Sequence, residues 1–526
     1  MEPSWREPNL SAGRIALNNR ECVICRENAS GKRQVPRISN LQPVGVASLP
    51  QPSAEAGLPP PGRNNLRCDN RSGMTSYQSA VERLYLLGHE LQSGPVRKFD
   101  LAHMRILCQA LGNPQHSFTS VLIAGTNGKG STAATLASIL HASSHRVGLY
   151  TSPHLLRVNE RICLNGQPIS DEAFAAAYCR VTAAATQLVA ASALPHLPSF
   201  FETMTAMAFD FYASSNAEIA VLEVGMGGRL DATNIVEPIL SVITDIDLDH
   251  QKYLGGTIAE IAREKAGILR PAVTAVTLPQ HPEANQVLGE TMTALGARAV
   301  SAVRNMASLS PGASSLVQSS SACTQFQLSV LGREVEIVSP LVGRHQLRNL
   351  ALAITAAEEL AAQGFHITPE TIARGVRQTC WPGRFQRLPG TAHRPEVIID
   401  VAHNPAGAWA LRSALTEQLG ERPLVLLFGA MADKAVDQIA KILWPLMSHV
   451  VLTRIANNPR AAAAADLASL AQSLGVEHSS SPTVPEGVDL ATTQANRLGP
   501  EAAIVIAGSI YVAGEAILAL RLPPAR

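Results

Sequence analysis

The stretch VLIAGTNGKGST, residues 121–132, decides the fold of this chain. Its first four residues are apolar and predict a buried strand, a glycine-rich turn follows, and the residues from Ala133 to His141 predict a helix. This order places Lys129 and the hydroxyl of Ser131 at the positive end of a helix, beside exposed backbone N–H groups. Such a turn binds phosphate, although its spacing differs from the strict GxxxxGK[ST] loop. A solvated lysine in a glycine-rich turn is the alternative, but the order of these parts favours a nucleoside triphosphate site.

The composition is typical of a large enzyme that acts on small molecules. The chain has 526 residues, which predicts two or three domains, and 46% of them are hydrophobic, enough to fill large cores. Its net charge of +1 creates no field that would attract nucleic acid or a membrane surface. No apolar run reaches the roughly 18 residues of a membrane span. Eight cysteines without regular spacing indicate reduced thiols, so we expect a cytoplasmic enzyme.

Residues 1–73 differ from the rest of the sequence. They are rich in proline and show no sustained helix or strand period, which predicts a disordered extension without a packed core. Cys22 and Cys25 form a CxxC pair, but no second pair follows at metal-ligand spacing, so chance is favoured over zinc or redox chemistry. Residues 77–86 then have the pattern of an amphipathic helix. We expect the folded part of the chain to begin near Met74.

Strands and helices alternate along the first half of the chain. Apolar strands are expected at residues 121–124, 147–150, 219–224, 240–244 and 273–278. Because helices fall between most of these strands, the pattern predicts a parallel sheet that is covered on both faces. Residues 324–340 alternate around the turn Leu331-Gly332-Arg333 and predict a hairpin. Helices are expected at residues 344–363 and 369–379.

The sequence Trp381-Pro382-Gly383-Arg384 interrupts this pattern and is expected to form a hinge. A second alternating series follows, with strands expected at residues 397–401, 424–428, 450–454 and 503–507. We therefore predict an α/β fold, with a large P-loop-type ATPase domain over residues 74–381 and a smaller Rossmann-like domain over residues 382–526. Ligands should bind at the carboxyl ends of the strands, in the cleft between the two domains.

Polar segments follow three of the expected strands. They are YTSPHL at 150–155, LEVGMGGRLDATN at 222–234 and DIDLDH at 245–250. Hard oxygen ligands and an imidazole near a phosphate loop are suited to Mg²⁺. Glu223 lies within an apolar strand, where an unpaired carboxylate would cost several kcal/mol, so either a metal or a core salt bridge should accompany it. His250 taken alone would be a satisfied core histidine, and only the neighbouring segments favour a metal ligand.

Lys265 is expected on the buried face of a helix. Thr257 and Glu260 form a capping box, and Ile258, Ile261 and Lys265 then share one helix face. Burial of a lysine lowers its pKa and favours the neutral amine. A neutral amine can add CO₂ to become a carbamate that ligates metal. The sequence pattern by itself favours the alternative, a snorkelling lysine.

Ten short motifs lie one after another along residues 74–526. In the first half they are GTNGKGST (125–132), TSPHL (151–155), LEVGMGGRLDATN (222–234), LDH (248–250) and REKAGI (263–268). In the second half they are GRHQLRNLALA (343–353), WPGR (381–384), DVAHNP (400–405), Asp433-Lys434 and AGSIYV (507–512). With these motifs the chain resembles the folylpolyglutamate synthase/dihydrofolate synthase branch of the Mur ligases. Met226 stands where this branch usually has leucine.

The resemblance implies a role for each matching residue. The ATP phosphates would be bound by Gly125, Thr126, Asn127, Gly128, Lys129, Gly130 and Ser131. Two Mg²⁺ ions would be held by Ser131, Ser152, Glu223, His250 and a carbamylated Lys265. The nucleotide would also contact Asn349, Arg384, Asp400 and His403 across the cleft. Glutamate would meet His403 and Ser509, and the pterin would meet Phe200 and Phe201. Lys129, Lys265 and His403 would act in catalysis.

The reaction implied by the resemblance is ATP-dependent amide formation through an acyl phosphate. Its partners would be ATP, L-glutamate and a folate or dihydropteroate, with no nucleic acid and no membrane, and the enzyme would be a monomer. A different Mur-type amino-acid ligase would share the GTNGK turn, but the LDATN and TSPHL segments favour the folate branch. A phosphate-loop regulatory NTPase would explain only the first half of the chain. A catalytically inactive, ligase-like binding module remains the third alternative.

Overall fold

The computed structural model describes residues 76–87, 100–307, 318–319, 323–456 and 458–521, which all belong to one unit, Asp69–Arg526. The extension expected at residues 1–73, with Cys22 and Cys25, lies outside the described residues. The first described helix is α1 (Tyr77–Leu86), where the amphipathic pattern predicted it. Among the described helices, none has both the length and the apolar character that crossing a membrane requires.

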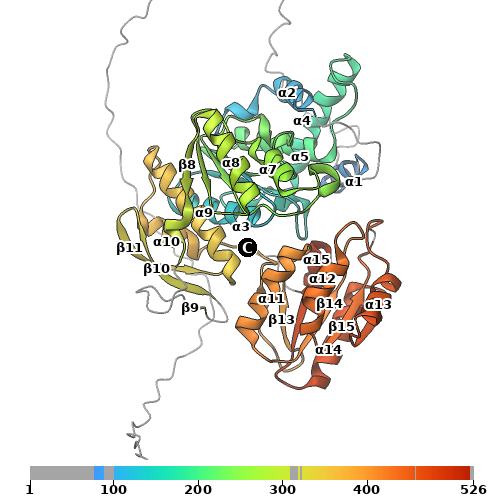
Figure 1. Cartoon of the computed structure of the whole chain (residues 1–526). Coiled ribbons are helices and arrows are strands. Elements are labelled where there is room, and N and C mark those ends of the chain that lie inside the picture. Colours follow the sequence, from blue (N-terminus) through green and yellow to red (C-terminus); the bar gives the residue numbers. More distant parts are fainter. Residues whose placement is uncertain (1–75, 88–99, 308–317, 320–322, 457, 522–526) are drawn as a thin grey trace, which may run out of the picture. The chain divides into compact units, whose positions relative to one another are not determined.

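The first half of the chain forms a mostly parallel sheet, as predicted (Figure 1). Its strand order is β4-β3-β2-β5-β1-β6-β7-β8 among the described residues. The strands are β1 (Thr119–Ala124), β2 (Val147–Tyr150), β3 (Ile162–Leu164), β4 (Gln167–Pro168), β5 (Ile219–Glu223), β6 (Leu240–Ile243), β7 (Thr274–Thr277) and β8 (Arg298–Ser301). Only β3 runs against the other strands, and it pairs antiparallel with β2 and with the edge strand β4. The parallel strands β5 and β6 flank β1, so the glycine-rich turn follows a central strand.

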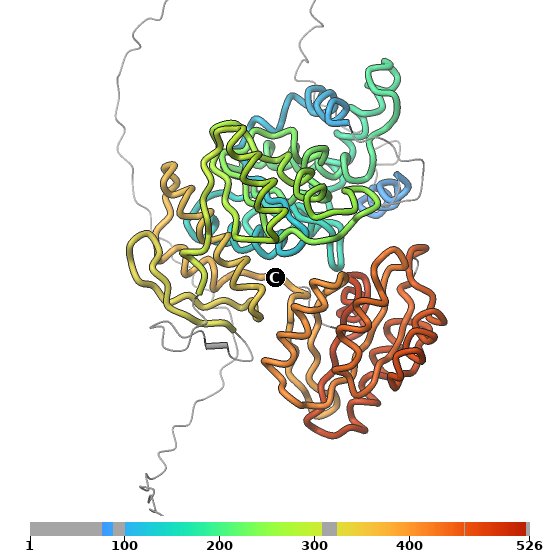
Figure 2. Tube along the Cα trace, in the orientation of Figure 1, coloured from blue at the N-terminus to red at the C-terminus, as the bar shows by residue number. Residues whose placement is uncertain are grey.

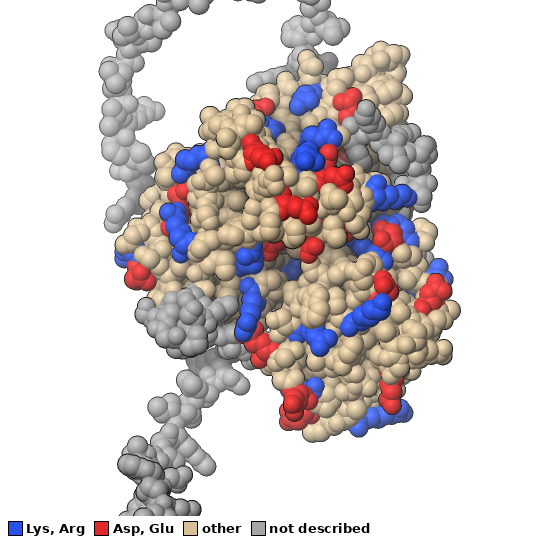
Figure 3. All heavy atoms as spheres, in the orientation of Figure 1, with Lys and Arg blue, Asp and Glu red and all other residues tan. Residues whose placement is uncertain are grey.

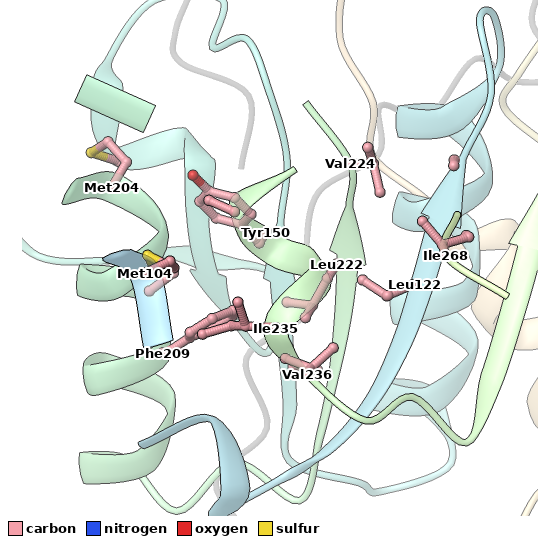
Figure 4. Packing of buried hydrophobic residues seen from close by; sticks show 14 of the residues in the cluster. Met104, Leu122, Tyr150, Met204, Phe209, Leu222, Val224, Ile235, Val236 and Ile268 are labelled. Carbon is pink, nitrogen blue, oxygen red and sulfur yellow. The ribbon is translucent and has the colours of Figure 1, made fainter. Parts of the chain in front are cut away.

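Helices cover both faces of this sheet because alternate residues of its strands point to opposite sides. On one face, Leu122 of β1 packs in a core with α1 and with α2 (Leu101–Ala110), α4 (Asp171–Ala190), α5 (Phe200–Ser214), α7 (Ile258–Ala266) and α8 (Pro282–Leu295). Figure 4 shows part of this core, with Phe209 of α5 beside Ile235. On the other face, Val121 and Ile123 pack in a core with α3 (Lys129–Ala142), α9 (Arg344–Ala362) and α10 (Pro369–Arg377).

The helix after the glycine-rich turn begins one turn earlier than predicted. The apolar pattern placed its start at Ala133, whereas α3 begins at Lys129. The earlier start is possible because Gly128 adopts a left-handed conformation with φ of 87°, which lets the chain enter a helix directly. The first turn is polar, so apolar periodicity could not detect it. Lys129 and Ser131 therefore lie within the first turn of α3.

The predicted hairpin is confirmed. Strands β10 (Thr324–Val330) and β11 (Arg333–Ser339) pair antiparallel, with β9 (Gln318–Ser319) beside β10. The two residues of the turn, Leu331 and Gly332, both have positive φ, which is the geometry that two-residue hairpins favour.

A second sheet follows residue 384, with the strand order β12-β13-β17-β14-β15-β16 among the described residues. Its strands are β12 (Gln386–Leu388), β13 (Glu396–Ile399), β14 (Leu424–Phe428), β15 (His449–Thr453), β16 (His478–Ser481) and β17 (Ala503–Ala507). Its helices are α11 (Pro405–Leu419), α12 (Val436–Leu443), α13 (Ala464–Ser473), α14 (Val484–Leu498) and α15 (Ile510–Ala519). The strands other than β12 are parallel, which confirms the Rossmann-like fold. Figure 2 follows the chain from the first sheet into the second, drawn in orange and red.

Basic and acidic side chains are interspersed on the face of the molecule that Figure 3 shows. This distribution agrees with the net charge of +1. Charge that selects a ligand must therefore come from a local arrangement of side chains.

Candidate active site

Two glycines shape the turn between β1 and α3, because neither position has room for a side chain. A Cβ atom at Gly125 would lie 1.8 Å from Oγ1 of Thr244, and one at Gly128 would lie 2.1 Å from Oδ1 of Asn349. Gly128 also has φ of 87°, in the region that favours glycine. The backbone of the turn can therefore pass very close to its neighbours, as phosphate-binding turns require.

Some backbone N–H groups of this turn form hydrogen bonds within the protein, and others remain available to a ligand. The N–H groups of Thr126 and Asn127 both donate to the carbonyl oxygen of Asp245, at 2.7 and 3.2 Å. These two hydrogen bonds hold the turn against the segment after β6. The groups left for an anion are the first N–H groups of α3, which have no intrahelical acceptor. Nζ of Lys129 folds back onto the carbonyls of Gly125 and Thr126, at 3.1 and 3.2 Å.

Glu223 ends β5 with its carboxylate only 4% exposed. Oε2 accepts a hydrogen bond from the N–H of Ser152 at 3.2 Å, and no ion pair of Glu223 is found within the described parts of the chain. Burial raises the pKa of this carboxyl, and the charge of Lys129 opposes the shift. The core salt bridge considered above is therefore absent there, and the carboxylate is left to meet a cation or a proton.

Lys265 is 3% exposed on α7, and its Nζ donates to the carbonyl of Gly125 at 2.7 Å. The snorkelling interpretation is wrong, because the amine ends beside the phosphate turn and not in solvent. The capping box of Thr257 and Glu260 is confirmed, and it fixes the register that turns Lys265 inward. Burial, aided by the charge of Lys129, lowers the pKa of this amine well below its usual value. The neutral amine is the form that can add CO₂.

His250 follows β6 and adopts a left-handed backbone conformation with φ of 51°. Burial lowers the pKa of its imidazole to about 4, so the ring is neutral at pH 7 and can offer a lone pair. Within the described residues, no three His, Cys, Asp or Glu side chains form a group that could hold a metal ion. A cation at this site would thus depend on donors outside those types, such as the Ser152 hydroxyl and a carbamate on Lys265.

The second sheet contributes residues at the carboxyl ends of its strands. Asp400 follows β13, and its buried carboxylate accepts the N–H groups of Phe385 and Ala402, both at 2.8 Å. Nδ1 of His403 lies 2.9 Å from the carbonyl of Val401 and must donate to it, so Nε2 is the ring atom left for a ligand. Ser509 begins α15 as its N-cap, with Oγ accepting the N–H of Tyr511.

One cavity of about 890 Å³ gathers nearly all the residues that the sequence pointed to. From the first half, it is lined by Gly125, Thr126, Asn127, Gly128, Lys129, Gly130, Ser131, Ser152, Phe201, Glu223, His250, Lys265 and Asn349. From the hinge and the second half, it is lined by Arg384, Asp400, His403 and Ser509. Phe200 is the exception: it stacks on Tyr85 and lies under the guanidinium of Arg161, with centroid distances of 5.5 and 5.1 Å. Its neighbour Phe201 faces the cavity in its place.

Sequence reasoning assigned no role to Asp249, Asn404 or Lys434, which also line the cavity. Asn404 carried a detectable signal, because an asparagine followed by proline is a common helix start, and it is the N-cap of α11. Asp249 could not be distinguished from Asp245 and Asp247 in its segment. Its partners come from distant parts of the sequence.

Two protein families match parts of this chain. The family "Mur ligase middle domain" matches residues 123–357, and the family "Mur ligase, glutamate ligase domain" matches residues 383–510. The folylpolyglutamate synthase of Lacticaseibacillus casei is 36% identical over 78% of this chain and 92% of its own length. The dihydrofolate synthase/folylpolyglutamate synthase of Bacillus subtilis is 33% identical over 83% of this chain and 97% of its own length.

Solved structures give the same assignment. Mycobacterium tuberculosis folylpolyglutamate synthase complexed with ADP has a TM-score of 0.75 and 33% identity, and the match covers 86% of this chain and 100% of that one. E. coli FolC in complex with DHPP and ADP has a TM-score of 0.70 and 28% identity over 84% and 97% of the two chains. These matches favour the folate branch over other Mur-type ligases and over a regulatory NTPase. The chain therefore belongs to the folylpolyglutamate synthase/dihydrofolate synthase family of Mur ligases and is an ATP-dependent, amide-forming ligase of that type.

Proposed function

We propose that this enzyme joins L-glutamate to the carboxylate of a folate or of dihydropteroate and converts one ATP to ADP and phosphate for each amide that it forms. The observation that carries the proposal is the single cavity, which is lined both by the phosphate turn and by His403, Asp400 and Ser509 of the second sheet. A phosphate turn alone would serve many ATPases. A second set of polar groups facing the same space is what a ligase needs to hold an amine against an activated acid.

In the proposed reaction, a carboxylate oxygen of the folate or pteroate attacks the γ-phosphorus of ATP. The bond from this phosphorus to ADP breaks, and ADP is the leaving group. The product of this step is an acyl phosphate. The lone pair of the glutamate amine then attacks the acyl carbon, the tetrahedral intermediate expels inorganic phosphate, and the nitrogen loses a proton. The amide, ADP, inorganic phosphate and the released proton account for all atoms of the substrates.

The chain's own residues bind and orient the reactants in this proposal. The first N–H groups of α3 and the ammonium of Lys129 would bind the phosphates, where the helix dipole adds to their charge. Asn349, Arg384, Asp400 and His403 would hold the rest of the nucleotide. Ser509 and His403 would hold the glutamate, and Phe201 would contact the pterin. Exclusion of water from the cavity by the bound substrates would also protect the acyl phosphate from hydrolysis.

We also propose that Mg²⁺ is held by Ser131, Ser152, Glu223, His250 and a carbamate formed on Lys265. The donor set suits this cation: Glu223 is a buried carboxylate without an ion pair among the described residues, and Lys265 is buried with a lowered pKa. When bound, Mg²⁺ would neutralise the charge that develops on the transferring phosphoryl group.

The deciding experiment gives the purified enzyme dihydropteroate and tetrahydrofolate in separate reactions, each with ATP, Mg²⁺ and isotopically labelled glutamate. We expect ADP release that requires both glutamate and the pterin substrate, and a labelled amide product in mass spectrometry. Product from one acceptor alone would assign the enzyme to one of the two activities. ADP release that proceeds equally without glutamate would contradict the proposal. Lys129→Ala serves as the control that must lose the activity.

Two further properties are proposed with the function. The boundary between the ATPase domain (residues 74–381) and the ligase domain (residues 382–526) is placed at the Trp381-Pro382-Gly383-Arg384 sequence, which limited proteolysis would locate. The enzyme is proposed to act as a monomer, which its mass in solution, measured by light scattering, would test.

A further inference from the structure

The carboxylate of Asp249 accepts hydrogen bonds from both halves of the chain. Its Oδ1 atom accepts Nζ of Lys434 at 2.8 Å and the backbone N–H of His250, also at 2.8 Å. Its Oδ2 atom accepts Nδ2 of Asn404 at 3.3 Å. Asp249 lies after β6 of the first sheet, whereas Asn404 begins α11 and Lys434 precedes α12 beside the second sheet.

Asn404 extends this arrangement to the phosphate turn. Its Nδ2 atom also donates to Oδ1 of Asn127 at 2.9 Å. Its Oδ1 atom accepts the N–H of Gly407 at 2.8 Å and so caps α11. Both ends of the amide are therefore used, which fixes its orientation. The start of α11, which carries His403 immediately before it, is tied through one side chain to Asp249 and to the phosphate turn.

On its own side, Asp249 belongs to a segment that is fastened to the phosphate turn. Oγ1 of Thr126 donates to the carbonyl of Asp247 at 3.0 Å and lies 3.0 Å from the N–H of the same residue. The N–H of Asn127 donates to the carbonyl of Asp245. Asp249 is thus held at a defined distance from the turn. Its hydrogen bonds then fix the positions of Lys434 and Asn404 relative to the turn.

The ion pair of Asp249 and Lys434 differs from the surface ion pairs of this molecule. The side chains are only 11% and 12% exposed, and both line the 890 Å³ cavity. A pair this poorly hydrated is costly to break on one side, because the remaining charge stays buried. The pair of Asp437 and Lys441 within α12 provides the contrast, since its side chains are 58% and 61% exposed and 3.6 Å apart.

We propose that Asp249 is a positioning residue of the ligase. It holds Lys434 and Asn404 against the phosphate turn, so that the groups of the second sheet, His403 above all, face the nucleotide in the geometry that the reaction needs. The inference rests on the proposed function and goes beyond it. Asp249 itself need not touch a substrate, and it acts through the two residues that it holds.

A double-mutant cycle tests this assignment. Asp249→Asn, Lys434→Gln and their combination are compared with wild type by kcat/KM for glutamate-dependent ADP release, with melting temperature as the check on folding. Asp249→Asn should lower kcat/KM about tenfold or more in wild type, but by a several-fold smaller factor in the Lys434→Gln background, because the contact with Lys434 is already lost there and only the contact with Asn404 remains. ADP affinity, measured by calorimetry, should change by less than about threefold, because the phosphate turn is intact. The matched changes Asp437→Asn and Lys441→Gln should alter neither quantity.

The inference is overturned if Asp249→Asn costs the same factor in both backgrounds, since the two residues would then act independently. A second measurement does not depend on ligase activity. Amide hydrogen exchange at residues 403–410 should quicken in Asp249→Asn and stay unchanged in Asp437→Asn. Unchanged exchange in both variants would also overturn the inference. If wild type binds ADP but makes no amide, the proposed function fails, and hydrogen exchange still decides the role of Asp249.

Discussion

Buried ionisable side chains give the cavity its chemistry. Glu223, Lys265 and Asp400 are each less than a tenth exposed, and burial disfavours the charged form of all three. Lys265 is thereby shifted toward a neutral amine, whereas Glu223 is shifted toward a neutral acid unless a cation joins it. The proposed Mg²⁺ would offset both costs, because it would stabilise a carbamate on Lys265 and the charged carboxylate of Glu223 together.

Lys265→Ala tests the chemistry at this residue. We expect it to abolish most of the ligase activity, because it removes the group that would become a carbamate. Because Lys265 lines the cavity, removing its side chain enlarges the space there, and we expect a small carboxylate to enter it. Added acetate should therefore restore part of kcat in Lys265→Ala. Acetate should have no such effect on Lys441→Ala, a change at an exposed lysine of α12. Absence of rescue at every acetate concentration would contradict the carbamate.

Gly128 offers a test of the phosphate turn with a close control. Gly128 and Gly112 have similar backbone conformations, with φ of 87° and 83°, so alanine should cost each about 1–2 kcal/mol of stability. A methyl group at Gly128 meets Oδ1 of Asn349 at 2.1 Å, whereas one at Gly112 meets nothing within 4 Å. We expect Gly128→Ala to raise the KM for ATP at least about tenfold and Gly112→Ala to leave it unchanged. Equal KM values in the two variants would show that the turn tolerates displacement.

At the scale of elements, the segment between β2 and β3 connects the metal-ligand candidates to the second sheet. It begins at Ser152, whose N–H bonds to Glu223, and it carries Leu155 and Leu156 into the core beside α14 and α15. Glu160 organises the segment, because its carboxylate accepts the backbone N–H groups of residues 155, 156 and 157. A shift of α15 should therefore be transmitted along this segment toward Ser152.

Gly514→Ala tests this connection between elements. A Cβ atom at Gly514 in α15 would lie 2.3 Å from the carbonyl oxygen of Leu155, so the segment must move to admit it. We expect kcat/KM to fall at least about tenfold while the protein stays folded. Gly289→Ala is the matched control in α8, where the added methyl meets nothing within 4 Å. That change should leave activity intact and stabilise the helix by about 0.5–1 kcal/mol. A fully active Gly514→Ala enzyme would disprove the coupling.

The way in which each element is stabilised determines whether it can be predicted from the sequence. Strands such as β1 and β14 are buried on both faces, so their apolar runs are visible in the sequence. The edge strand β16 reads His-Ser-Ser-Ser and gave no such signal, because it is formed by pairing with β15. The same difference, between local pattern and tertiary contact, applies to the residues of the site. The phosphate turn is recognisable from local pattern. That pattern also places Lys265 on a buried helix face, but it does not show that the amine ends beside Gly125. The proposed role of Asp249 depends on Asn404 and Lys434, which only the tertiary fold brings near.

At the scale of the whole molecule, four half-buried histidines among the described residues make stability depend on pH. Burial lowers the pKa of His154 to about 3 and that of His250, His345 and His403 to about 4. Three of them line the cavity, so neutral imidazoles are part of the active-site environment. In the unfolded chain each ring would titrate near pH 6.5. Between pH 6.5 and about 4 these rings therefore bind protons in the unfolded chain but not in the native state, so their contribution to stability falls as the pH falls.

His154 is the histidine at which this linkage can be measured most cleanly. Its Nδ1 atom accepts a hydrogen bond from Nε of Arg161 at 2.9 Å, so protonation would both break that bond and place two cations side by side. Its Nε2 atom lies 3.2 Å from the hydroxyl of Tyr85. Glutamine can offer both an acceptor and a donor there, but it cannot be protonated.

We therefore predict that His154→Gln reduces the loss of unfolding free energy between pH 7 and pH 5. The reduction should be about 2 kcal/mol, from a pKa that lies below pH 5 in the native state and near 6.5 in the unfolded chain. Urea denaturation at both pH values gives the quantity. The raised pKa values of Glu223 and Asp400 have the opposite effect on the pH dependence of the unfolding free energy. This effect is the same in wild type and in His154→Gln, so the comparison of the two proteins isolates the contribution of His154. His393→Gln, at an exposed position, should behave as wild type. An equal pH dependence in all three proteins would mean that His154 has the same pKa in the native and unfolded states, and it would contradict the prediction.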